Sequence, residues 1–324
     1  DQSIYAFRGA RTGNMLDFET DFGVEKVIKL EQNYRSHGNI LDAANALIRN
    51  NRARLGKNLW TSEGKGEMLR GYEAATDIEE ATYILDEVRA LKNEGVNLSD
   101  MALLYRSNAQ SRVLEHALFS AGIAYRVYGG LRFFERQEIK HALAYLRLIA
   151  NPEDDGALLR VINFPTRGIG NRTLEQIQAA SEGTGVSLWQ AACSSPPTGR
   201  AGAAIGAFIS LIESMRSATQ GLPLQEQVEH VIEASGLIDH YRKEREGADR
   251  VENLEELVNA AATFVNEEGL ANYEADVANS ATGDTEAPEV QELDPLSAFL
   301  AHASLEAGDN QAAAGADALQ LMTV

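Results

Sequence analysis

Cysteine is nearly absent from this chain of 324 residues, which contains only Cys193. A single cysteine excludes an internal disulfide and any metal site built from several thiolates, and it fits a reducing, cytoplasmic setting. The sequence also lacks an apolar run near the roughly 20 residues that cross a bilayer, so we expect no membrane association. A phosphate-cradling loop of the form G-x-x-x-x-G-K-[ST] is missing as well.

Lysine and arginine are absent after Arg250, whereas 15 of the 48 acidic residues follow it. The net charge of −19 therefore reflects mainly an acidic C-terminal region, and local basic patches can exist in residues 1–250. Acidity that serves only solubility is the alternative reading. The charge balance thus does not exclude a nucleic-acid partner.

Residues 1–10 combine polar and aromatic groups that suit nucleotide and base contacts. Gln2 offers an uncharged amide for a terminal phosphate. Tyr5 and Phe7, next to Arg8, alternate with other residues and can stack on successive bases, at about 1–3 kcal/mol for each contact. A strand end with packed aromatic rings is the alternative. Half of a nucleotide site without a phosphate loop favours a fragment of a larger motor.

A second stretch with this chemistry follows a predicted strand and precedes a predicted helix. There Tyr34 can stack on a purine, and Arg35 can form a bidentate contact with a phosphate. Ligands of α/β sheets bind at the carboxyl ends of strands, where both residues are expected. A structural arginine paired with Glu31 or Asp42 is the alternative.

The spacing of apolar residues changes from mixed strands and helices to helices alone. In the first part it predicts strands at 24–30, 67–72, 101–105 and 124–128, and helices at 38–50, 77–94 and 111–121. Such alternation favours a parallel α/β sheet. Gly129 and Gly130 then form either a hinge or a tight turn. After them the apolar spacing predicts helices at 137–149, 156–162, 172–183, 187–193, 199–217, 223–235, 236–245, 250–266 and 294–305.

Two further segments complete this reading. Residues 267–292 are polar and acidic and are predicted to be a disordered loop, and residues 319–324 are predicted to be an apolar strand.

The segment 166–173 contains two glycines before a predicted helix, whose free N–H groups can bind phosphate without reading sequence. A tight helix–helix turn is the alternative. The candidate DNA-binding residues here are Thr166, Arg167, Gly168, Ile169, Gly170 and Arg172. We expect Gly168→Asp to weaken duplex binding and to leave the fold intact.

Taken together, these segments resemble a known family. Residues 1–10 and 30–36 are similar to motifs III and IV of superfamily 1A DNA helicases. Residues 104–112, 128–140 and 163–170 resemble accessory motifs of the UvrD-like group, which includes PcrA and Rep. The resemblance covers the chain except for roughly residues 269–292.

The resemblance implies an ATP-dependent 3′–5′ DNA helicase that unwinds duplex DNA in repair and replication, with ATP and Mg²⁺ as its cofactors. It implies a RecA-like parallel-sheet motor portion with a mainly α-helical 2B subdomain inserted. Residues 1–31 would end subdomain 1A, residues 32–128 would begin 2A, residues 129–318 would form 2B, and residues 319–324 would return to 2A. The expected partners are single-stranded DNA, junctions of single- and double-stranded DNA, and DNA-repair proteins.

The resemblance also implies residue roles. Gln2 and Arg35 would contact the γ-phosphate as catalytic residues, and Tyr34 would stack on adenine. Tyr5, Phe7 and Arg8 would lie along the single strand, and Arg106 would contact DNA. The family usually has Trp where Phe7 stands, so stacking there is expected to be weaker. Walker A, Walker B and motifs V and VI are missing, so the magnesium ligands lie elsewhere and this chain alone is expected not to hydrolyse ATP.

Two other functions fit parts of the sequence. A non-catalytic DNA-binding or regulatory module would explain the missing phosphate loop, and an exonuclease-coupled relative is disfavoured because no nuclease signature is present. The histidines, among them His37, His116, His141 and His302, show no metal-ligand spacing. We therefore predict no metal site, and Cys193 has no catalytic partner nearby in the sequence.

Overall fold

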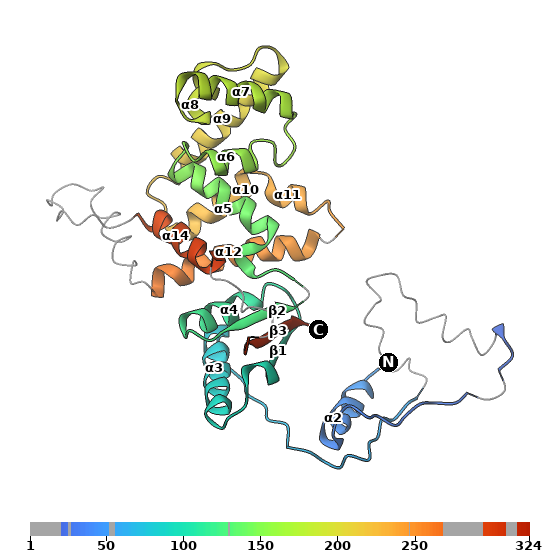
Figure 1. The fold of residues 1–324 in the computed structure, drawn as a ribbon. Coiled ribbons are helices and arrows are strands. Elements are labelled where there is room, and N and C mark those ends of the chain that lie inside the picture. Colours follow the sequence, from blue (N-terminus) through green and yellow to red (C-terminus); the bar gives the residue numbers. More distant parts are fainter. Residues whose placement is uncertain are drawn as a thin grey trace. The chain divides into compact units, whose positions relative to one another are not determined.

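The computed structural model describes residues 21–24, 27–51, 56–128, 130–245, 247–267, 294–308 and 316–324. Contacts between residues divide the chain into two compact units, Asp1–Ala74 and Ala75–Val324. Figure 1 shows the elements of both units. The division falls at Ala74, a position at which the sequence indicated no boundary.

The first unit is built around α2 (Gly38–Ile48) and the loop that follows it. The Asn45 side chain accepts the N–H of Leu59 at 3.0 Å and donates to the Leu59 carbonyl at 2.7 Å, which holds the loop on the helix. A parallel bridge joins Gln32 to Trp60. The strand predicted at 24–30 is wrong for its described residues 27–30, and the strand predicted at 67–72 is also wrong, because both segments are irregular.

The second unit contains a three-stranded parallel sheet. Its strands are β1 (Ala102–Tyr105), β2 (Tyr125–Tyr128) and β3 (Leu319–Thr323), in the order β1-β3-β2. Leu321 of β3 pairs with Leu103 on one side and Val127 on the other. The last strand of the chain therefore lies between two strands that precede it by about 200 residues. The parallel α/β sheet predicted from the sequence is confirmed.

Two helices pack on one face of this sheet. They are α3 (Asp77–Asn93) and α4 (Ser111–Ser120), and the short 3-10 helix η2 (Leu98–Asp100) precedes β1. Val88 and Leu118 from the helices form a core with Leu319 and Leu321 from β3. Leu104, by contrast, is 61% exposed. The strand predicted at 101–105 is present as β1, and these helices cover only one of its faces.

The rest of the second unit is helical, as the apolar spacing predicted. After η3 (Phe133–Glu135), its helices are α5 (Gln137–Ala150), α6 (Asp155–Val161), α7 (Asn171–Thr184), α8 (Leu188–Ser194), α9 (Arg200–Thr219), α10 (Leu224–Ala234), α11 (Leu237–Tyr241), α12 (Gly247–Glu267) and α14 (Pro295–Gly308). Their apolar faces share one core, in which Tyr145, Phe208 and Phe299 are almost fully buried. Figure 1 shows α7, α8 and α9 at the end of this helical part that lies away from the sheet.

Side-chain caps begin several of these helices. Asp154 accepts the N–H of Ala157 at 2.9 Å at the start of α6, and Ser187 accepts the N–H of Gln190 at 3.2 Å at the start of α8. The helix predicted at 236–245 ends earlier, at Tyr241. Almost all of the predicted loop 267–292, and Gly129, lie outside the described residues. None of the described helices is long and apolar enough to span a membrane.

Candidate functional site

The side chain of Asn163 bridges the turn between α6 and α7. The Asn163 side-chain oxygen accepts the backbone N–H of Arg167 at 2.9 Å and that of Ile169 at 3.1 Å. Ile169 is 1% exposed and anchors the turn in the helical core. Gly168, between these two residues, has a φ of +78°, a conformation that glycine adopts without strain. The turn therefore presents a fixed backbone.

This turn leads directly into the N-terminus of α7. The Gly170 carbonyl accepts the N–H groups of Thr173 and Leu174, so the preceding amides of Asn171 and Arg172 have no acceptor inside the helix. Among the described residues, no side chain caps this helix, and its first turn carries no acidic residue. The positive end of the helix dipole and these exposed amides suit an anion such as a phosphate.

The predicted DNA-binding residues of this segment divide by exposure. Thr166, Gly168, Gly170 and Arg172 are exposed, and together with the α7 amides they form one surface, which we call the α7 turn. The Ile169 side chain is buried, so it positions this surface and offers no side-chain contact of its own.

The Arg167 side chain is only partly exposed and forms hydrogen bonds within the fold. Its guanidinium donates to the carbonyls of Val161 at 3.2 Å, Pro165 at 3.1 Å and Ser235 at 3.0 Å. It also lies over the ring of Tyr145, 5.7 Å from the centroid. These contacts hold the Arg167 guanidinium within the fold, whereas Arg172 supplies an exposed charge. The DNA-binding role of Arg167 stays a prediction.

Tyr34 and Arg35 lie in the first unit, just before α2. Tyr34 is 80% exposed, and its hydroxyl donates to the Gln32 side-chain oxygen at 3.0 Å. The Asn33 side chain accepts the N–H groups of Arg35 and Ser36 at 2.9 and 2.8 Å, which shapes the turn into the helix. Both predicted nucleotide-binding side chains therefore face solvent. The described residues place neither of them against a phosphate-binding loop.

Arg106 begins the turn between β1 and α4. The Gln110 side-chain oxygen accepts the backbone N–H groups of Arg106 and Ser107 at 2.9 and 3.0 Å, and the Arg106 side chain is exposed. The Ser107 hydroxyl donates to the Glu252 carboxylate of α12 at 3.0 Å. Arg106 thus lies where the sheet and the helical part meet, apart from the α7 turn.

A buried polar network at the same junction was missed by the sequence analysis. The Arg136 guanidinium donates to the Asn108 carbonyl at 2.8 Å, to Asn253 at 2.9 Å and to the Ser111 hydroxyl at 2.7 Å. Burial raises the pKa of Glu115 to about 7, against the lowering effects of its hydrogen bond from Ser111 and of the Arg136 charge. Arg136 and Asn253 are more than a hundred positions apart, so sequence spacing could not reveal their contact.

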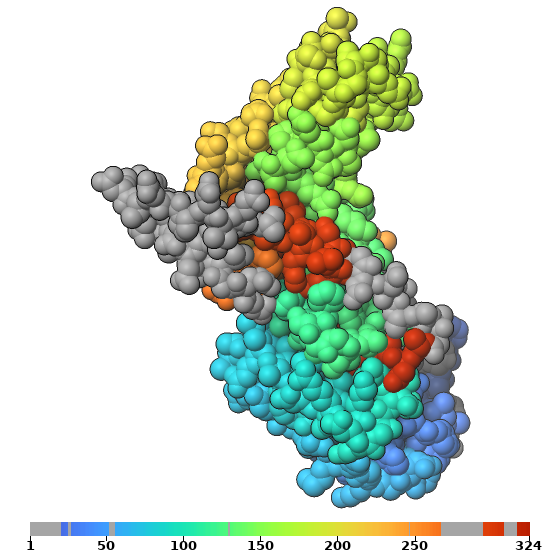
Figure 2. Space-filling view, turned by 60° about the vertical axis from the view of Figure 1, so that its left-hand side comes forward, coloured from blue at the N-terminus to red at the C-terminus, as the bar shows by residue number. Residues whose placement is uncertain are grey.

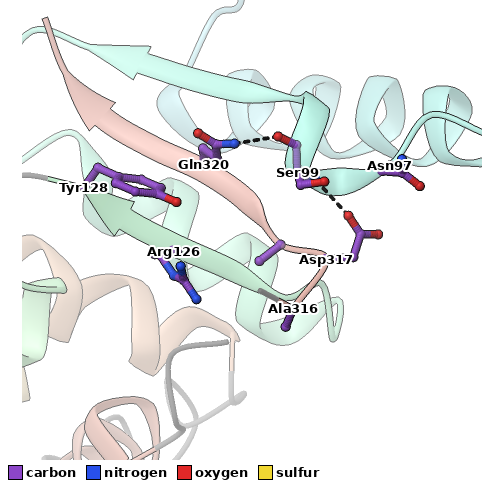
Figure 3. Close-up of a pocket in the computed structure, with 8 residues that line it drawn as sticks. Asn97, Ser99, Arg126, Tyr128, Ala316, Asp317 and Gln320 are labelled. Atoms are coloured by element: carbon purple, nitrogen blue, oxygen red, sulfur yellow. Dashed lines mark hydrogen bonds between the residues drawn. The ribbon is translucent and has the colours of Figure 1, made fainter. Parts of the chain in front are cut away.

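A polar pocket of about 290 Å³ opens beside β2 and β3. Figure 3 shows Ser99 between Asp317 and Gln320, with Arg126 and Tyr128 on the neighbouring strand. The N–H of Ser99 donates to Asp317 at 2.8 Å, and the Gln320 amide donates to the Ser99 carbonyl. These groups bind one another and join η2 to β3, so we assign the pocket a structural role. The predicted site residues Gln2, Tyr5, Phe7 and Arg8 lie outside the described residues.

The sequence of this chain was also compared with known protein families. The model of the UvrD-like helicase C-terminal domain matches residues 28–324. The chain therefore belongs to the UvrD-like helicase family.

Named relatives give the same result. DNA helicase II of Escherichia coli strain K12 is 47% identical over 330 aligned positions, which cover 100% of this chain and 43% of that protein. ATP-dependent DNA helicase UvrD1 of Mycobacterium tuberculosis strain H37Rv is 40% identical over 338 positions, which cover 100% and 42%. ATP-dependent DNA helicase PcrA of Staphylococcus epidermidis strain RP62A is 39% identical over 287 positions, which cover 86% and 39%. The chain spans less than half the length of these relatives.

Proposed function

We propose that this chain is the duplex-binding part of an ATP-dependent DNA helicase that moves 3′ to 5′ and unwinds DNA in repair and replication. The observation that carries this proposal is the α7 turn, where an uncapped helix N-terminus lies beside the exposed Arg172, an arrangement that suits a phosphate group. Contacts of this kind grip a duplex without reading its sequence. Single-stranded DNA, its junctions with duplex, and repair proteins are the proposed partners.

The subdomain assignment belongs to the same proposal. Residues 1–31 end subdomain 1A, residues 32–128 begin a RecA-like 2A, residues 129–318 form 2B, and residues 319–324 return to 2A. The sheet topology supports an insertion, because β2 and β3 are hydrogen-bonded neighbours although the whole helical part lies between them in the sequence.

ATP with Mg²⁺ is the proposed cofactor of the whole helicase. Arg35 would stabilise the charge of the γ-phosphate with Gln2, and Tyr34 would stack on the adenine ring, a use that its exposed ring permits. The sequence has no G-x-x-x-x-G-K-[ST] loop, so this chain alone would not hydrolyse ATP. Phosphate release by the purified chain, measured with and without single-stranded DNA, tests this. Turnover stimulated by DNA would contradict it.

Duplex affinity tests the central part of the proposal. Arg172→Gln removes the exposed charge of the α7 turn, whereas Arg245→Gln removes an exposed charge after α11. We expect Arg172→Gln to weaken binding of a forked DNA severalfold and to reduce the slope of log K against log salt by about one. The control should stay close to the unsubstituted chain. An equal loss of DNA affinity in both variants would show that DNA binding is not localised to the α7 turn.

A further inference from the structure

Two histidines and a glutamate meet where α4 packs against α14. The Nδ1 atom of His116 lies 2.7 Å from the Oε1 atom of Glu306, and the Nε2 atom of His302 lies 2.9 Å from the same oxygen. His302 and Glu306 are one helical turn apart on α14, so they share a face of that helix. Figure 2 shows the red surface of α14 adjoining the green surface of the segment that holds α4 and β2.

We propose that His116, His302 and Glu306 form a zinc-binding site. One ligand atom from each residue lies within 4.8 Å of the others. Zinc binds imidazole nitrogen and carboxylate oxygen at about 2.0–2.2 Å, and three protein ligands with one water complete a common four-coordinate site. Tetrahedral geometry at those bond lengths separates the ligand atoms by roughly 3.3 Å. The two contacts to Glu306 therefore need to lengthen by only about half an ångström.

The surroundings hold these side chains in place. The side chains of His116, His302 and Glu306 are 20%, 21% and 8% exposed, and they line a cavity of about 20 Å³. Such a volume accommodates a single water molecule or ion. The His302 ring lies 5.1 Å from the Phe264 ring and 6.4 Å from the Phe119 ring, centroid to centroid. Aromatic walls restrict the imidazole and reduce the entropy that metal binding would remove.

The charges around the cavity also suit a cation. Arg112 lines the cavity, but its guanidinium forms an ion pair with Glu256 of α12. Glu256, which lies outside the cavity lining, offsets the charge of Arg112, and Glu306 is the one carboxylate among the residues that line the cavity. A divalent cation would be attracted to this carboxylate.

A path to solvent is present. His116 and Thr263 also line a groove of about 360 Å³ between α3 and α4. Bound zinc would join α4, which covers the sheet, to α14 of the helical part through direct ligand bonds. None of these zinc ligands belongs to the α7 turn, so zinc binding can be tested separately from duplex binding.

Metal titration of the whole chain, produced without a polyhistidine tag, tests the proposal. Calorimetry with Zn²⁺ and visible absorption of bound Co²⁺ measure affinity and stoichiometry. We expect one zinc per chain and a fall in affinity of about tenfold or more in His302→Gln and in Glu306→Gln. His230→Gln, on α10, is the matched control and should bind zinc like the unsubstituted chain.

The proposal is overturned if the chain binds no zinc, or if both cluster variants bind it as tightly as the control. X-ray absorption of the zinc-loaded, unsubstituted chain gives a second result that does not depend on the variants folding. A shell of nitrogen and oxygen with two imidazole signatures supports the site. A sulfur neighbour would assign the metal to the exposed Cys193 and overturn the proposal.

Discussion

The side-chain oxygen of Asn163 lies 3.1 Å from the backbone nitrogen of Ile169 and accepts its hydrogen bond. The same oxygen accepts the N–H of Arg167, so one amide side chain fixes the turn that precedes α7. Ile169 fills the core beneath this turn, and Gly168 and Gly170 leave its outer side open. The geometry of the α7 turn therefore depends on Asn163, an uncharged residue.

Asn163 offers a matched pair of substitutions. Asn163→Ala removes the acceptor of two backbone N–H groups and should lower the free energy of unfolding by roughly 1–3 kcal/mol, as measured by urea denaturation. Asn163→Asp keeps the acceptor and should stay closer to the unsubstituted stability, while its negative charge weakens duplex binding, most strongly at low salt. Unchanged duplex affinity of the Asp variant at low salt would contradict a phosphate site at this turn.

The two exposed glycines should respond differently to alanine. Gly168 has a φ of +78°, so Gly168→Ala should destabilise the fold by about 1–2 kcal/mol. Gly170 has a φ of −89° with nothing within 4 Å of an added Cβ, so Gly170→Ala should preserve stability and weaken duplex binding by keeping phosphate away from the backbone. Thermal unfolding and DNA titration separate the two effects. Aspartate tolerates the left-handed region better than alanine, so the prediction that Gly168→Asp leaves the fold intact stays a prediction.

Arg167 should behave as a structural residue. Arg167→Lys keeps the charge but cannot donate to the carbonyls of Val161, Pro165 and Ser235 together, so we expect a loss of roughly 1–3 kcal/mol in unfolding free energy. Arg172→Lys, at an exposed position, is the control and should change stability by less than about 0.5 kcal/mol. Equal stabilities of the two variants would refute the structural role of Arg167.

His141 should make stability depend on pH. Burial, followed by the nearby Arg160, lowers the pKa of His141 to about 4, and its Nδ1 lies 2.7 Å from the Tyr241 hydroxyl. Between pH 4 and about 6.5 the unfolded chain binds more protons at this residue, so the contribution of His141 to stability rises with pH over that window and is constant above it. His141→Gln should flatten this part of the curve of unfolding free energy against pH. An identical slope in the variant would show that His141 does not cause it.

The spacing of apolar residues predicted the helices well, because this signal lies within each helix. The helix predicted at 172–183 is α7 (Asn171–Thr184), and the following Gly185 has the left-handed conformation that ends many helices. The strand predicted at 24–30 failed because alternation alone does not make a strand. Ile28 and Leu30 are exposed, and within the described part of the chain residues 27–30 pair with no other strand.

The candidate site was predictable only in part. Two glycines before a helix indicated the α7 turn, because this pattern is local. The partners of Arg167 were not predictable, since the Ser235 carbonyl is 68 positions away and only the fold brings it close. His116 and Glu306 are 190 positions apart, so the spacing of the histidines along the sequence could not reveal their cluster. Long-range contacts of this kind decide which charged groups remain available to a ligand.

Amide hydrogen exchange tests the account most directly, because the claim concerns backbone N–H groups. The exchange of the segment that includes Gly168, Asn171 and Arg172 is measured in the chain alone and with a saturating forked duplex. We predict that DNA slows exchange in this segment, and that the slowing is reduced in Gly170→Ala. Saturating DNA that protects other segments and leaves this one unchanged would contradict the assignment of the α7 turn as the duplex-binding surface.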